Sequence, residues 1–334
     1  MTDSLKLFET ETLYNEAKSD FVYPTVSYVK DVNRVFYMTK PSILDLPIKA
    51  VFYDSSTGSF VKLYPNQITE VNPNYTPIGV EVVPVEHDVY GTGQAGIMSL
   101  AEMSRNTPGN GSSSYQDIYW GGNGTDTSLP NYNKVNLVDD TTANSGYLPS
   151  DKFTGTTSLD GVSKYYSTAN NIPSPFNADG SRNEAYYTTT YSTANALSDF
   201  DGVGNTTVLT DLATGQSDWK TATTITNNSG AGYYPAACCC WRFHTPGTEQ
   251  GQWYLPAMGE MGYVINRISA INETINKVKS VYSSVVAVAL NTDAYYWSSS
   301  EYSANEVRSF SLSYGTVVVD GKNFYLNTRA FLRL

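Results

Sequence analysis

The last forty residues of this 334-residue chain constrain its fold most, because a run rich in Tyr, Ser and Asn lies there between two rigid-looking blocks. Residues 295–301 (YYWSSSE) begin this stretch and residues 329–334 (RAFLRL) end it. Between them, Ser309, Ser311 and Ser313 alternate with Phe and Leu, which predicts a half-buried strand with its serines facing solvent. Tyr, Ser and Asn are typical of recognition surfaces, since Tyr gives wide contact at low entropic cost and the others give adaptable hydrogen bonds. We therefore expect a binding protein.

Composition excludes several other classes of protein. Charged residues make up 16% of the chain, below the roughly 25% of ordinary soluble domains, while Tyr occurs 27 times. The formal net charge of −11 argues against nucleic-acid binding, which needs a concentrated basic face. No apolar stretch is long enough to span a bilayer, and the N-terminus does not match a secretory signal, so we expect synthesis in the cytoplasm without membrane insertion.

The chain divides by composition into two expected domains. Residues 1–105 contain several strand-like apolar runs separated by turn residues, and they predict a small β-rich N-terminal domain. Residues 106–334 would form the ligand-binding domain, with a loop-rich insert at about 139–228. One long helix is expected over 257–279, where Met, Ile and Val recur at three-to-four spacing after Pro256.

All three cysteines are consecutive, at Cys238–Cys240. They form no disulfide framework, and the chain has only two histidines, His87 and His244, to share a metal site with them. We expect a buried strand over 233–243. A reactive Cys240–His244 pair is the alternative, because a spacing of four places both on one side of a strand, but a reactive thiolate needs an accessible, electropositive setting.

Two short motifs rich in glycine or aspartate resemble known ligand-binding loops. Residues 91–96 (GTGQAG) match a dinucleotide-binding fingerprint, but the following apolar run is too short for the helix of that unit, so a tight turn is expected. Residues 199–205 (DFDGVGN) resemble the start of an EF-hand, although Val203 and Thr210 occupy ligand positions. Asp199 and Asp201 remain weak candidates for a different calcium turn, and a plain Asp/Gly turn is the alternative.

Catalysis has little support in the sequence. The chain has no G-x-S-x-G motif, and a Ser or Cys nucleophile would have to use one of the two histidines. We expect no enzyme and no cofactor. Trp253 with Glu260, and Trp297 with Glu301, could be mistaken for sugar-stacking sites, but we expect both tryptophans to be core aromatics.

Four motifs together resemble a known family. They are WYLPAMGE (253–260), YWSSSE (296–301), RAF (329–331) and, less specifically, YPAACCCWRFH (234–244). They resemble the C-type-lectin-like fold, an α+β fold, and more narrowly the variable proteins of diversity-generating retroelements, many of which phages and prophages of gut bacteria carry. The first hundred residues resemble a phage tail attachment module less closely.

The resemblance implies a diversified surface. In such systems a reverse transcriptase copies a template with errors at adenines, so that Asn codons are replaced while the scaffold is kept. Trp297, Gly315, Lys322 and Arg329 would be fixed scaffold. The implied ligand-binding positions are Tyr295, Tyr302, Ser303, Asn305, Ser309, Ser311, Ser313, Tyr314, Thr316, Val318, Asp320, Asn323, Tyr325 and Asn327.

The resemblance also bounds the function. The E-P-N and Q-P-D triplets of calcium-dependent sugar lectins are absent, so we expect recognition by side chains alone. The expected protein is a receptor-binding protein of the virion at a phage tail tip. A homo-oligomer, preferably a trimer, is expected, because several copies multiply weak single-site binding. It would bind a host protein or polysaccharide and attach to other tail proteins through its N-terminal domain. The alternatives are a non-variable bacterial adhesin or glycan-binding module and, remotely, an enzyme of the formylglycine-generating type.

Overall fold

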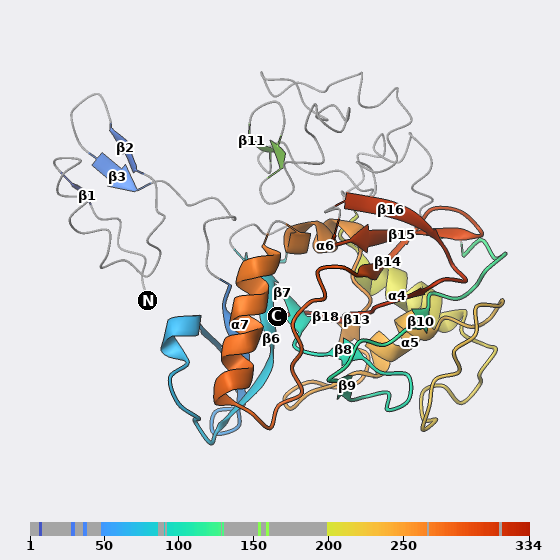
Figure 1. The fold of residues 1–334 in the computed structure, drawn as a ribbon, viewed down its shortest axis with the longest axis horizontal. Coiled ribbons are helices and arrows are strands. Elements are labelled where there is room, and N and C mark those ends of the chain that lie inside the picture. Colours follow the sequence, from blue (N-terminus) through green and yellow to red (C-terminus); the bar gives the residue numbers. More distant parts are fainter. Residues whose placement is uncertain are drawn as a thin grey trace. The chain divides into compact units, whose positions relative to one another are not determined.

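A computed structural model describes most of the chain (Figure 1). The described residues are 48–85, 90, 92–127, 129, 199–265, 267–313 and 316–334, and short strands lie at Leu7–Phe8 (β1), Tyr28–Lys30 (β2), Phe36–Met38 (β3), Phe153–Thr154 (β11) and Ser158–Leu159 (β12). The chain forms two compact units, Met1–Pro47 and Ile48–Leu334. In the first unit, β1, β3 and β2 form an antiparallel sheet in that order.

The second unit is built on a six-stranded antiparallel sheet with the order β13-β18-β7-β6-β4-β5. Its strands are β4 (Ala50–Asp54), β5 (Ser59–Leu63), β6 (Tyr75–Val83), β7 (Gly96–Ser99), β13 (Trp253–Tyr254) and β18 (Phe331–Arg333). Almost all of β6 and all of β7 are buried. The central strands are therefore core elements, as expected for strands rich in Val, Ile and Met.

This sheet corrects the expected domain boundary near residue 105. β7 pairs with the C-terminal strand β18, with Met98 opposite Phe331 and Ile97 opposite Leu332. Strands from both ends of the sequence thus complete one hydrogen-bonded ladder, and a domain cannot end between them. The compact units divide at Pro47 instead. Composition could not reveal this boundary, because the pairing joins residues more than two hundred positions apart.

The expected helix over 257–279 is two helices, α6 (Met258–Ile265) and α7 (Ile268–Val281). Arg267, which is buried, lies between them and donates from Nη1 to the backbone oxygen of Val82 at 2.9 Å. The three-to-four spacing of apolar residues continues across the break, so periodicity alone does not show it. In Figure 1, α7 runs alongside β6. Ile271 and Ile275 are among its buried residues.

The cysteines lie in a helix, α5 (Pro235–Arg242), and the expected strand over 233–243 is wrong. Pro235 occupies one of the first helical positions, where its missing N–H costs nothing. Burial of all three thiols is confirmed. Small apolar residues in succession are compatible with a buried helix as well as a buried strand, so this pattern could not distinguish the two.

A second sheet holds the C-terminal region. β14 (Tyr295–Glu301), β15 (Glu306–Ser311) and β16 (Thr316–Gly321) are antiparallel neighbours in sequence order, and Figure 1 shows them stacked apart from β6 and β7. Smaller ladders pair β8 (Glu102–Met103) with β9 (Gly111–Ser112) and β10 (Ile118–Tyr119) with β17 (Tyr325–Leu326). The other helices in the described ranges are α4 (Gly202–Asp211) and a short 3₁₀ helix, η3 (Pro65–Gln67).

The fold is therefore mixed, with helices packed on several antiparallel sheets. Most of the loop-rich insert at 139–228 lies outside the described residues, and its last part contains α4. Trp253 and Trp297 are both fully buried, which confirms their role as core aromatics. No helix in the described part of the chain is long and apolar enough to cross a membrane.

Candidate recognition surface

The serines of β15 do not face solvent, so that expectation is wrong. Ser309 and Ser311 are fully buried, and so is Phe310 on the other side of the strand. β15 is the middle strand of its sheet and both of its faces are covered. Small hydroxyl side chains can be buried when they are hydrogen-bonded. Ser309 Oγ donates to the carboxylate of Asp320, and Ser311 Oγ lies 3.2 Å from Ser313 Oγ.

The other implied ligand-binding positions are spread over three environments. The exposed ones are Asn305, Ser313, Asn323 and Tyr325. The half-buried ones are Tyr295, Tyr302, Ser303, Val318 and Asp320. Asn327 is buried, and its backbone bonds to Tyr295 and Trp297. Tyr314 and Gly315, and the side chain of Thr316, lie outside the described residues.

Four segments that are distant in sequence form one surface. They are residues 119–126, 227–230, 303–305 and 322–325. Their backbones are joined by hydrogen bonds from Gly121 N to Lys322 O (3.2 Å), Asn123 N to Ser229 O (2.7 Å), Gly124 N to Ala304 O (3.0 Å) and Lys322 N to Asn305 O (2.9 Å). We call their outward side chains the recognition surface: Tyr119, Asn228, Asn305, Asn323, Phe324 and Tyr325.

Gly121 allows the first of these segments to pass close to the backbone of Tyr233. Its φ of +98° is in the left-handed region. A Cβ atom there would lie 1.9 Å from the backbone oxygen of Tyr233. Only glycine fits this position without moving the backbone.

An exposed tyrosine pair lies on the recognition surface. Tyr119 on β10 and Tyr325 on β17 are directly opposite in the ladder, and their rings stack with centroids 4.0 Å apart and an interplanar angle of 26°. Tyr119 Oη donates to Tyr325 Oη at 2.6 Å, and this hydrogen bond raises the pKa of Tyr119. Cross-strand aromatic pairs of this kind stabilise a short ladder and fix both rings. Tyr325 and its neighbour Phe324 nevertheless remain 51% and 52% exposed.

A buried ion pair supports this surface from below. The side chains of Lys322 and Glu301 are in contact and have no exposed area. Lys322 Nζ also donates to Thr125 O at 2.9 Å and lies 4.9 Å from the ring centre of Trp120, while Thr127 Oγ1 donates to Glu301 at 2.9 Å. Burial raises the pKa of Glu301 and lowers that of Lys322, and the contact between the two opposes both shifts. Since every charge has a partner, the pair can fix the turn that leads into Phe324.

A second buried ion pair holds the C-terminal segment. Arg329 Nε donates to Glu102 at 2.9 Å, and Tyr296 Oη donates to the same carboxylate oxygen at 2.9 Å. Burial is the main cause that raises the pKa of Glu102. Trp297, Lys322 and Arg329 are all buried.

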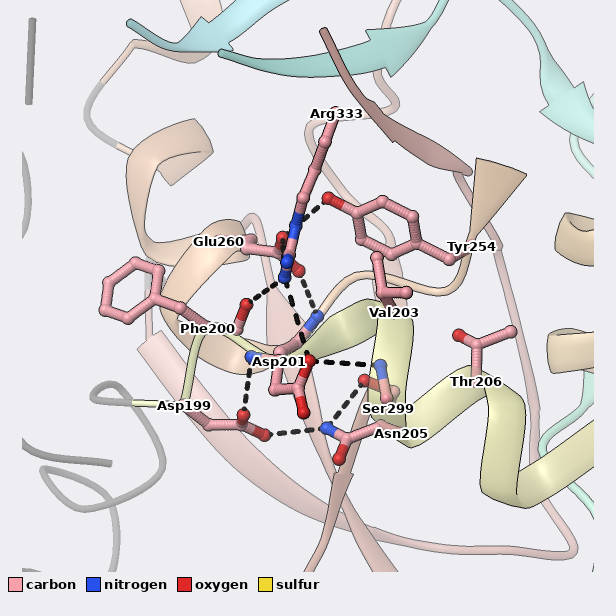
Figure 2. Close-up of polar contacts among 12 residues, drawn as sticks. Asp199, Phe200, Asp201, Val203, Asn205, Thr206, Tyr254, Glu260, Ser299 and Arg333 are labelled. Carbon is pink, nitrogen blue, oxygen red and sulfur yellow. Dashed lines mark hydrogen bonds and ion pairs between the residues drawn. The ribbon is translucent and has the colours of Figure 1, made fainter. Parts of the chain in front are cut away.

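The weak calcium candidates serve as hydrogen-bond acceptors in Figure 2. Asp201 Oδ1 accepts from Gly204 N at 3.0 Å and caps the N-terminus of α4. Asp199 accepts from Asp201 N, Asn205 Nδ2 and Ser300 Oγ at 3.0, 2.9 and 2.6 Å. Within the described ranges, no three His, Cys, Asp or Glu residues are grouped so that they could hold a metal ion. These aspartates therefore fit a structural turn.

Glu260 forms the other polar centre of Figure 2. Its carboxylate accepts from Tyr254 Oη and from Ala257 N, both at 2.7 Å, and lies 3.7 Å from Arg333 Nη2. Burial raises the pKa of Glu260 to about 7, against the opposing effect of Arg333. The carboxylate binds a backbone N–H at the start of α6, a capping arrangement.

The thiols are not placed for chemistry. Burial raises the pKa of Cys239 to about 12 and that of Cys240 well above its ordinary value. Cys240 Sγ lies 4.0 Å from the backbone oxygen of Arg329, whereas the exposed His244 has its Nδ1 3.2 Å from Arg242 O. The possible Cys240–His244 pair is thus not formed. His87 lies outside the described residues.

Sequence reasoning found only part of the recognition surface. It included Asn305, Asn323 and Tyr325 and missed Tyr119, Asn228 and Phe324. The signal that could have found Tyr119 was its place beside Trp120 in an otherwise polar segment. Phe324 could have been noticed as a large apolar residue within a turn.

Comparison with known proteins adds one similarity. No protein-family model and no curated protein matches the chain. Among solved structures, a fimbrial protein from Bacteroides ovatus is similar at 14% identity with a TM-score of 0.39. The match covers 86% of this chain and 48% of that protein, so this chain spans about half of its length.

Proposed function

We propose that this protein is a receptor-binding protein that attaches to a molecule on a cell surface through the recognition surface. The observation that carries the proposal is the joining of four distant segments into one face with exposed aromatic and amide side chains. Tyr, Phe and Asn contribute contact area and adaptable hydrogen bonds in binding surfaces. The buried Glu301–Lys322 pair gives that face a fixed support. Rigid side chains lose little entropy on binding, which favours affinity.

A finer proposal concerns the type of protein. The motifs that resemble the variable proteins of diversity-generating retroelements support a C-type-lectin-like second unit and a place at a phage tail tip. The first unit, Met1–Pro47, would then contact other tail proteins. Several copies, preferably three, would add avidity to a weak single site.

Burial narrows the positions that we propose to be diversified. Exposed Asn305, Asn323 and Tyr325 can change without disturbing the core, whereas Ser309 and Ser311 are enclosed. The nucleotide sequence tests this part of the proposal. A near-identical template repeat beside a reverse-transcriptase gene, differing at adenines in the codons of the exposed positions, is the expected finding. Absence of such a repeat, with cell binding retained, would instead favour the non-variable adhesin.

Cell binding tests the proposal as a whole. Fluorescently labelled full-length protein is mixed with a panel of intact gut bacterial cells and bound protein is measured by flow cytometry. We expect binding to some members of the panel and its loss in the double variant Phe324→Ala/Tyr325→Ala. Tyr115→Ala is the matched control, because Tyr115 is also exposed, at 43%, and lies outside the recognition surface. Equal binding by the double variant and the wild type would overturn the proposal.

A further inference from the structure

We infer that the recognition surface binds an uncharged saccharide and does so without calcium; this inference rests on the proposed function and specifies its ligand. Three properties of the surface lead to it: two exposed rings, of which Tyr325 is held by Tyr119, exposed amides beside them, and a lack of exposed positive charge in the four described segments. The rings and amides suit a sugar, and the lack of positive charge disfavours anionic ligands.

The exposed rings suit the C–H faces of a sugar ring. Aromatic side chains carry negative charge on the ring face and therefore attract polarised C–H groups. Phe324 and Tyr325 are consecutive and about half exposed. Stacking on Tyr119 and the hydrogen bond between the phenols fix Tyr325 before any ligand arrives. A ring that is already fixed loses little side-chain entropy when a ligand binds.

The amides suit the hydroxyl groups of a sugar. An asparagine side chain both donates and accepts hydrogen bonds, and a hydroxyl group does the same. Asn305 and Asn323 are exposed. The hydrogen bond from Lys322 N to Asn305 O holds the two segments that carry them at a fixed spacing. Aromatic and amide groups are thus offered together on one rigid surface.

Charge disfavours anionic ligands at this surface. Lys322 is the one cationic residue in the four segments, and it is buried against Glu301. Arg308, on the adjoining strand β15, is 3% exposed, with its guanidinium carbon 4.7 Å from the ring centre of Tyr302. Asp126, in contrast, is exposed. Among the described residues of these segments, sialylated, sulfated or phosphorylated glycans would therefore meet no exposed positive charge, on a chain of net charge −11.

Calcium is not needed for the contacts described. The six side chains of the surface are rings and amides, and the exposed Asp126 adds one carboxylate, whereas calcium sites require several carboxylate or carbonyl oxygens that converge. No group of three acidic, His or Cys residues suited to a metal occurs in the part of the chain that the structure describes. The inference therefore predicts that a chelator leaves binding unchanged.

A glycan array tests the ligand class directly. Full-length wild type and the variants Phe324→Ala, Tyr325→Ala and Tyr115→Ala are applied in EDTA to neutral hexose and N-acetylhexosamine glycans and to sialylated and sulfated ones. We expect neutral glycans to be bound, and binding to fall about tenfold or more in the first two variants and to stay unchanged in Tyr115→Ala. Phe324→Ala guards against misfolding, since it leaves the Tyr119–Tyr325 pair intact. Binding to anionic glycans alone, binding that requires calcium, or no binding at all would overturn the inference.

Treatment of the cells separates this inference from the proposed function. Periodate cleaves vicinal diols of sugars, whereas proteinase K removes surface proteins. Loss of cell binding after periodate, with binding kept after protease, is expected. Loss after protease alone, with Phe324→Ala/Tyr325→Ala still unable to bind, would overturn the saccharide inference and leave the proposed function standing. Binding that the double variant retains would overturn both.

Discussion

Lys322 and Glu301 form an ion pair in which neither side chain is exposed, two residues before the exposed Phe324. The pair joins the end of β14 to the turn that follows β16, and Thr125 and Thr127 complete its hydrogen bonds. Breaking a buried pair leaves an uncompensated charge, which costs far more than the pair itself contributes. Lys322, the one cationic residue of the four described segments, is thus withdrawn from solvent by its pairing with Glu301.

The first prediction concerns this pair. Lys322→Met leaves the Glu301 carboxylate buried without its partner, so the free energy of unfolding should fall by about 3–5 kcal/mol. The double variant Glu301→Gln/Lys322→Met removes both charges and should recover most of that loss. Urea unfolding followed by fluorescence gives both values. A single variant as stable as the wild type would show that the two side chains are not paired in solution.

A second prediction follows from Glu260. Its pKa of about 7 in the folded protein lies above the ordinary value of 4.5. Between these values the folded state holds the proton that the unfolded state has lost, so the contribution of Glu260 to stability is largest at low pH and is lost as pH rises through 7. The total is about 3 kcal/mol, at about 1.4 kcal/mol for each pH unit between the two values.

Glu260→Gln removes this proton linkage. The difference in unfolding free energy between wild type and variant, measured by urea unfolding from pH 5 to pH 8, should move in favour of the variant as pH rises. A difference that stays constant over this range would show that Glu260 ionises in the folded protein as it does in water.

A third prediction concerns the thiols. Cys238, Cys239 and Cys240 are buried in α5, and burial raises the pKa of each. The native protein should not react with Ellman's reagent at pH 8, whereas all three thiols should react in guanidinium. Fast reaction of one thiol in the native state would revive a catalytic or redox role for this helix.

The fourth prediction tests which positions tolerate diversification. Asn323→Tyr places a ring at an exposed site and should change the free energy of unfolding by no more than about 0.5 kcal/mol. Ser309→Tyr places the same ring in a filled core position and should cost about 1–3 kcal/mol or more. Thermal unfolding of the two variants compares them directly. Equal tolerance at both positions would mean that β15 is open to solvent after all.

The sequence predicted some of these features because they depend on local pattern. Alternation correctly placed a strand at Ser309–Ser311, and the buried Trp253 and Trp297 were expected. The alternation of polar and apolar residues does not show that both faces of β15 are covered, because burial depends on the elements that pack against the strand. The helix is interrupted at Arg267, but the three-to-four spacing of apolar residues continues across that point. Periodicity therefore gives no sign of the interruption.

The recognition surface was harder to predict because its parts meet through topology. Tyr119 and Tyr325 are 206 residues apart and become neighbours in the β10–β17 ladder. Nothing in either local segment indicates its partner. Likewise, the pairing of β7 with β18, which moves the domain boundary to Pro47, is a long-range contact that composition does not record.

Footprinting on bound cells tests the central claim most directly. Full-length protein is exposed to hydroxyl radicals while free and while bound to cells of the panel, and oxidation is measured by mass spectrometry of its peptides. The account predicts that Phe324, Tyr325 and Tyr119 become protected on binding and that Tyr115 is oxidised equally in both states. Protection of Tyr115, with the recognition surface as reactive as in the free protein, would contradict it.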